Sequence, residues 1–129
     1  MAASFLAGGA SIAVLDDGSS SYGGYVVFSE NEKPFKILLY NSDYYDGDGD
    51  RSSQTIILTG LTASTVSAKR LTASSATSTQ SGGGLSFGGQ TFVDATCDIE
   101  GSEVVETISV NEGQAAFQLA SSEALLLLI

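Results

Sequence analysis

Short apolar-rich runs recur along the whole chain, separated by clusters of Gly, Asn, Asp and Ser. This spacing is typical of strands joined by tight turns and not of alternating strands and helices. No segment of the sequence has a convincing helical pattern of apolar residues. We therefore predict an all-β fold, an antiparallel β-sandwich of about eight strands. We count eight or nine strands among the apolar-rich runs, which are Ile12–Leu15, Tyr25–Phe28, Phe35–Tyr40, Gln54–Leu58, Thr65–Leu71, Leu85–Phe87, Gln90–Val93, Val104–Val110, Gln114–Ala120 and Ala124–Leu128.

Two of the connections have the composition of hairpin turns. Glu30–Pro34 joins two of the predicted strands, with its proline at the strand margin. Asn111-Glu112-Gly113 joins another pair. The Ser/Thr/Gly-rich stretch 72–84 is predicted to be a surface loop.

The last predicted strand is continuously apolar. It contains Leu125, Leu126, Leu127 and Leu128 in succession. Because neighbouring side chains of a strand point to opposite faces, these leucines cannot all enter one core. We expect at least two of them to face outward unless another segment covers that side. This strand is accordingly the candidate interface for a partner or for self-association.

The length of 129 residues fits one domain. It is too short for a (β/α)₈ barrel, which needs about 250 residues. We divide the chain into an N-terminal segment, residues 1–21, with room for one strand, and a β-sandwich over residues 22–129.

Charge and composition exclude several classes of function. Five Lys and Arg against fifteen Asp and Glu give a net charge of −10, which disfavours nucleic acid and anionic membranes as partners. Without histidine the chain has no Ser-His-Asp or Cys-His catalysis. The single Cys97 provides neither an internal disulfide nor a thiolate zinc site, and no cofactor is implied. Met1–Ala7 lacks the basic region of a secretory signal.

The acidic segment Asp43–Arg51 has alternating aspartates at Asp46, Asp48 and Asp50. Calcium prefers several oxygen ligands from such a loop, so these three are candidate ligands. The EF-hand pattern fails, however. With Asp46 as the first position, the sixth is Arg51 instead of glycine and the twelfth is Ile57 instead of glutamate. A solvated loop between two strands is the favoured interpretation.

Aromatic and acidic residues offer two further kinds of site. Tyr44 and Tyr45 lie in the same loop and are candidate carbohydrate contacts, whereas tyrosines in strands usually pack at the rim of a core. Glycoside hydrolysis needs two carboxylates flanking the sugar bond. The Asn-Glu pairs at Asn31-Glu32 and Asn111-Glu112 fall in predicted turns. We therefore assign no catalytic residue.

A series of segments in order resembles the C-terminal β-domain of glycoside hydrolase family 79, which contains β-glucuronidases and is similar to heparanases. The resemblance runs from about Tyr22 to Ile129. The segments are Tyr25–Asn31, Ile37–Asn41, Tyr44-Tyr45, Arg51, Lys69–Ala73, Leu85–Phe92 and Ser122–Leu126.

The resemblance implies that catalysis takes place outside this chain. Family members are secreted or lysosomal retaining enzymes with two catalytic glutamates on a (β/α)₈ barrel, and the sandwich packs against that barrel. A strand from before the barrel also completes the sandwich; here it is absent or replaced by Met1–Leu15. The implied function is a non-catalytic accessory domain whose partner is a barrel of the same or another chain, in an extracellular or secretory compartment.

The alternative is a free-standing carbohydrate-binding sandwich, assisted by calcium bound through Asp43–Asp50. A self-sufficient enzyme is disfavoured because the barrel is missing.

Overall fold

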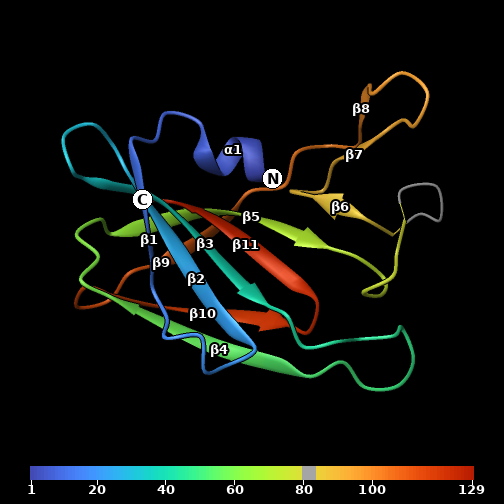
Figure 1. Cartoon of the computed structure of the whole chain (residues 1–129), viewed down its shortest axis with the longest axis horizontal. Coiled ribbons are helices and arrows are strands. Elements are labelled where there is room, and N and C mark those ends of the chain that lie inside the picture. The colour runs from blue at the N-terminus through green and yellow to red at the C-terminus, as the bar shows by residue number, and fades with distance from the viewer. Residues whose placement is uncertain (80–83) are drawn as a thin grey trace.

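The computed structural model of the chain describes residues 1–79 and 84–129. Two antiparallel sheets and one short helix form three layers (Figure 1). The large sheet lies in the middle, a two-stranded sheet covers one of its faces, and the helix covers part of the other. The described residues contain eleven strands, three of them only two residues long, so the predicted all-β sandwich is confirmed.

The large sheet is built around β11 (Glu123–Leu128), which lies between β3 (Pro34–Asn41) and β5 (Thr65–Thr72). On the β3 side follow β2 (Tyr22–Phe28) and then β1 (Ser11–Val14) at the edge. On the other side both β6 (Ser86–Phe87) and β9 (Glu106–Ser109) pair with β5. The strand that comes last in the chain is therefore central in this sheet.

The second layer consists of β4 (Ser53–Thr59) and β10 (Gln114–Ala120), which pair along their full lengths. A further pair, β7 (Thr91–Phe92) and β8 (Ile99–Glu100), forms an arm that projects beyond the two layers (Figure 1). Part of the predicted loop 72–84 lies outside the described residues.

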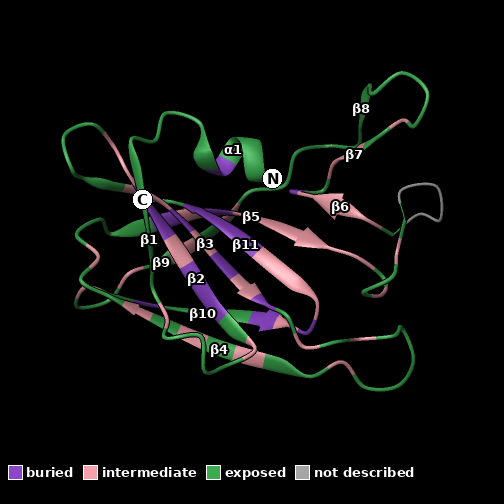
Figure 2. Ribbon diagram, in the orientation of Figure 1, coloured by how far each residue is buried: buried purple, intermediate pink, exposed green. Residues whose placement is uncertain are grey.

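The core fills the space between the two sheets, and buried and exposed residues alternate most clearly along β10 (Figure 2). Each fully buried Leu, Val or Phe side chain contributes about 1.5–3 kcal/mol relative to exposure. The buried core residues are Val26, Ile37, Leu39, Val66, Ala68, Ala115, Phe117, Leu119, Leu125 and Leu127.

One predicted hairpin is confirmed and the other is wrong. β2 and β3 pair across the Glu30–Pro34 connection as expected. Around Asn111 the turn forms, with Glu112 and Gly113 at φ of 51° and 75° and mutual hydrogen bonds between Asn111 and Gln114. The strands that flank this turn separate, because β9 joins β5 in the large sheet whereas β10 joins β4. The turn is thus a corner between the two layers.

The sequence pattern gave no sign of α1 (Ala2–Leu6), a single turn of helix that packs on the outer face of the large sheet. Its Phe5 is buried against Val27 and Leu126. The Lys36 ammonium donates hydrogen bonds to the carbonyls of Ser4 and Ala7, 2.6 and 2.7 Å long, which fixes the end of the helix on β3. In the described residues no helix is long and apolar enough to cross a bilayer.

The helix also supplies the covering segment that the expectation for the leucine run allowed. Leu125 and Leu127 enter the core between the sheets, and Leu126 is buried beneath α1. Leu128 alone of the four is exposed, at 41%. Of the outward pair, Leu126 is covered by the chain itself and Leu128 is not.

Candidate functional site

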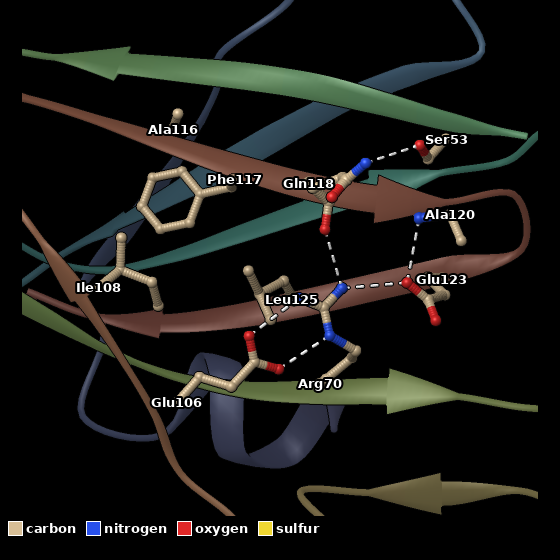
Figure 3. Close-up of a pocket in the computed structure, with 10 residues that line it drawn as sticks. All are labelled: Ser53, Arg70, Glu106, Ile108, Ala116, Phe117, Gln118, Ala120, Glu123 and Leu125. Atoms are coloured by element: carbon tan, nitrogen blue, oxygen red, sulfur yellow. Dashed lines mark hydrogen bonds and ion pairs between the residues drawn. The ribbon is translucent and has the colours of Figure 1, made fainter.

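A groove of about 490 Å³ opens between β10 and the strands β5 and β9 (Figure 3). The groove exists because β9 pairs with β5 and not with β10. In the described part of the chain, therefore, no strand pairs with the edge of β10 that faces the groove. Arg70 lies at the centre, on the core-facing side of β5 in alternation with Val66 and Ala68.

The guanidinium of Arg70 connects three elements. Its Nε and Nη2 donate hydrogen bonds to both carboxylate oxygens of Glu106, at 2.8 and 2.9 Å. Its Nη1 donates to the Gln118 carbonyl and to Oε2 of Glu123, each at 3.0 Å. The hydrogen bonds and ion pairs to Glu106, followed by the charge of Glu123, hold the pKa of Arg70 above its ordinary value, although burial opposes this.

Glu123 is the most enclosed acid of the groove, with its side chain 10% exposed. Burial by itself would raise its pKa. The Ala120 N–H, the Thr72 hydroxyl and the Arg70 guanidinium outweigh burial and hold the pKa of Glu123 below its ordinary value. Glu123 is therefore ionised at neutral pH.

This arrangement favours structure over catalysis. A retaining glycosidase needs one carboxyl group that is protonated near neutral pH, which requires a raised pKa. Glu123 has a lowered pKa and is paired with Arg70. Glu106 is held by the same cation. The groove holds a network of ion pairs and hydrogen bonds that joins β5, β9, β10 and β11 at the open end of the sandwich.

The same side chains occupy part of the open edge of β10. Arg70 binds the Gln118 carbonyl, and Glu123 binds the Ala120 N–H. At the other end, Gln114 bonds with Asn111. Because alternate residues of a strand turn their backbone groups to opposite sides, Ala116 turns its N–H and C=O toward the groove between these fixed ends.

The loop that contains the two candidate carbohydrate contacts separates them. Tyr44 is 70% exposed. Tyr45 is half-buried: its N–H donates to the Ser122 hydroxyl at 3.2 Å and its own hydroxyl donates to the Gly49 carbonyl at 3.3 Å. Tyr45 thus helps to fold the loop, and Tyr44 is the one whose ring is free for a ligand.

Arg51 fixes this loop to the rest of the sandwich. Its guanidinium lies 5.0 Å from the centre of the Tyr45 ring. It donates to the carbonyls of Ser121, Ala73 and Ser122 at 2.8, 3.1 and 3.4 Å. One cation therefore satisfies carbonyls in two separate turns.

The three candidate calcium ligands are exposed. The Asp48 N–H donates to the carboxylate of Asp46 at 3.0 Å, and the Gly49 N–H donates to that of Asp48 at 2.9 Å. Within residues 1–79 and 84–129, no three acidic or thiol side chains converge on one point. Asp46 and Asp48 shape the loop through these side chain to backbone hydrogen bonds.

The groove was not among the predicted sites. A signal for it was present, because the alternation along 65–71 puts Arg70 in line with Val66 and Ala68. The partners of Arg70 come from β9 and β11, which no local pattern brings together.

Comparison with known proteins agrees with this sandwich fold. Residues 24–126 match the family model described as the glycosyl hydrolase family 79 C-terminal beta domain. A crystal structure of a 4-O-α-L-rhamnosyl-β-D-glucuronidase from Fusarium oxysporum 12S, in complex with Rha-GlcA, is 48% identical with a TM-score of 0.92. The match covers 97% of this chain and 27% of that enzyme.

More distant comparisons add nothing on function. CelM2, a bifunctional glucanase-xylanase protein from a metagenome library, matches 84% of this chain and 16% of its own chain at 9% identity, with a TM-score of 0.48. No curated protein matches the sequence.

The fold and the family match define the class as an accessory β-sandwich without a catalytic barrel. The chain belongs to the C-terminal β domains of glycoside hydrolase family 79. The family resemblance read from the sequence is thereby confirmed.

Proposed function

We propose that this chain packs against a (β/α)₈ barrel and stabilises it within a β-glucuronidase-like enzyme. The observation that carries the proposal is the 48% identity, over 97% of the chain, to part of the Fusarium oxysporum glucuronidase. The chain spans only 27% of that enzyme. The activity proposed for the whole enzyme is hydrolysis of β-D-glucuronides, with the catalytic carboxylates on the barrel.

The open edge of β10 gives this role a structural basis. A two-stranded sheet is marginal by itself, and an unpaired strand edge is a template for further pairing. The strand that family 79 enzymes contribute from before the barrel would add beside β10. There the backbone N–H and C=O of Ala116 face the groove. The hydrogen bonds that Arg70 and Glu123 make to the edge of β10 limit the length of the strand that could be added.

A chimera tests the proposal. This chain would replace the matching 27% of the Fusarium oxysporum enzyme. We expect the chimera to be folded and to hydrolyse an aryl β-glucuronide, whereas the isolated chain should show no turnover above background.

Two results would contradict the proposal. One is a chimera that aggregates or is inactive while the parent enzyme is active under the same conditions. The other is turnover by the isolated chain that survives repurification and disappears when one of its glutamates is changed. The parent enzyme without its C-terminal domain is the control for barrel stability.

A second function, carbohydrate binding by the sandwich itself, is favoured by one observation. Tyr44 is the most exposed large apolar side chain in the described residues, and it lies on a loop held by Arg51. Affinity electrophoresis of the chain in a glucuronic-acid polysaccharide tests it. Retardation lost in Tyr44→Ala but kept in Tyr22→Ala would support binding at this loop, and unretarded migration would contradict it.

A further inference from the structure

The two outer faces of the sandwich differ in chemistry. The small sheet turns Ser53, Thr55, Thr59, Gln114 and Gln118 outward, which is the polar composition expected of a face in water. Ile57 is the large aliphatic exception there, 61% exposed.

The outer face of the large sheet has the opposite composition. The register of its strands turns mainly apolar side chains away from the core, among them Val14, Tyr25, Leu38, Tyr40, Leu71 and Phe87. The outward positions of β1, β2, β3, β5, β6 and β11 contain no acidic residue, although the chain has fifteen. A face of this kind is expected to be covered.

Helix α1 covers only one end of this face. Phe5 lies over Val27 and Leu126, and Lys36 holds the helix at that end. Toward the other end the half-buried rings of Tyr25 and Tyr40 stack on each other, with centres 6.0 Å apart and planes at 25°. Tyr25 also packs against the margin of the Phe5 cluster.

A small apolar groove extends the uncovered end. Leu71 and Phe87 line it together with Met1, Leu85 and Phe92. The N-terminus therefore lies beside β6, at the margin of the face (Figure 1).

We propose that the uncovered end of the outer face of the large sheet, from Val14 through Tyr25, Tyr40 and Leu71 to Phe87, is the surface that docks on the catalytic barrel. This inference rests on the function proposed above. The family is named for a C-terminal domain, so the barrel precedes it in the polypeptide. In a polypeptide that contains both parts, the connection from the barrel would enter near the margin of this face, which Met1 lines.

Two other occupants fit less well. A second copy would bring together two chains of net charge −10, which repel each other. A carbohydrate needs several polar side chains directed at its hydroxyl groups, and this face is mainly apolar. An apolar surface of the barrel would cover the apolar side chains of this face that α1 does not cover.

Hydroxyl-radical footprinting compares the isolated chain with the chimera described above. We expect oxidation of Tyr25, Tyr40 and Phe87 to fall several-fold in the chimera. Tyr44 and Ile57, which lie off this face and are 70% and 61% exposed, should react equally in both.

Matched variants give a second readout. Val14 and Ile57 are both outward-facing β-branched residues, 59% and 61% exposed, on opposite faces of the sandwich. Val14→Asp and Ile57→Asp should leave the melting temperature of the isolated chain nearly unchanged. In the chimera only Val14→Asp should lower the temperature of thermal inactivation, by several degrees.

Several outcomes would overturn the docking surface. If Tyr25 and Tyr40 are oxidised as fast in an active chimera as in the isolated chain, or if Ile57 is protected in their place, the barrel binds elsewhere. Protection that already appears in the isolated chain and grows with its concentration means that a second copy covers the face. A chimera that neither folds nor hydrolyses glucuronide contradicts the accessory function itself, which distinguishes the two failures.

Discussion

The guanidinium of Arg70 binds the carboxylate of Glu106 through two parallel hydrogen bonds, 2.8 and 2.9 Å long, across the opening of the sandwich. Such two-point pairing is among the strongest ionic contacts in proteins. It is reinforced here because the same cation holds the more deeply enclosed Glu123.

Replacing this cation should destabilise the fold. Arg70→Met leaves Glu123 and Glu106 without their shared partner, and we expect the free energy of unfolding to fall by about 2–3 kcal/mol. Lys69→Met is the control, since Lys69 pairs with the exposed Glu103 and should cost less than about 1 kcal/mol. Urea unfolding measures both; equal losses would contradict a special role for Arg70.

The lowered pKa of Glu123 predicts a pH dependence of stability. The folded protein keeps Glu123 ionised at a pH where the unfolded chain, with an ordinary value of 4.5, already binds a proton. The stabilisation is therefore complete above that value and is lost as the pH falls through the lower, folded pKa. In urea melts between pH 7 and pH 3, Glu123→Gln should show a shallower decline than the parent chain. Thr72→Val, which removes one hydrogen bond to Glu123, should lie between them; identical profiles would contradict this.

Phe5 should anchor the helix. Phe5→Ala removes a side chain that is 4% exposed between α1 and the large sheet, and we expect a loss of about 3 kcal/mol. Its neighbour Leu6 is 53% exposed, so Leu6→Ala should change stability by no more than about 0.5 kcal/mol. Thermal melts of the two variants test this, and a small effect of Phe5→Ala would mean that the helix is dispensable.

Calcium should change stability little, because the carboxylates of Asp46 and Asp48 already accept hydrogen bonds from the loop backbone. A tight site would stabilise the fold by about 2.7 kcal/mol at a free concentration 100 times Kd. Melting with calcium and, as control, magnesium measures this. A strong rise with calcium alone, lost in Asp48→Asn, would identify these aspartates as ligands.

The sequence was sufficient to predict the elements that are determined by the local alternation of apolar and polar residues. Strands such as β10 alternate cleanly, and the β2–β3 connection has the composition of its turn. It was insufficient at Asn111, because the same tight turn serves a hairpin and a corner between layers, and only the pairing of β9 with β5 decides which.

Long-range contacts explain the other differences. Helix α1 is too short to show a helical hydrophobic periodicity in the sequence. It packs on the sheet through Phe5, which contacts residues that are distant in the chain. In the leucine run, alternate side chains must point away from the core, and the sequence does not show which segment covers them. The groove depends on ion pairs between residues from three separate strands, which no short motif encodes.

The central position of β11 has a consequence for biosynthesis. This strand follows all the others in the chain yet separates β1–β2–β3 from β5, β6 and β9. Until the ribosome has released it, the nascent polypeptide has two unfinished half-sheets, each with an edge of unpaired backbone N–H and C=O groups. Folding of this domain is therefore completed only after translation of its final strand, and a premature stop before Glu123 would leave both half-sheets open to aggregation and degradation.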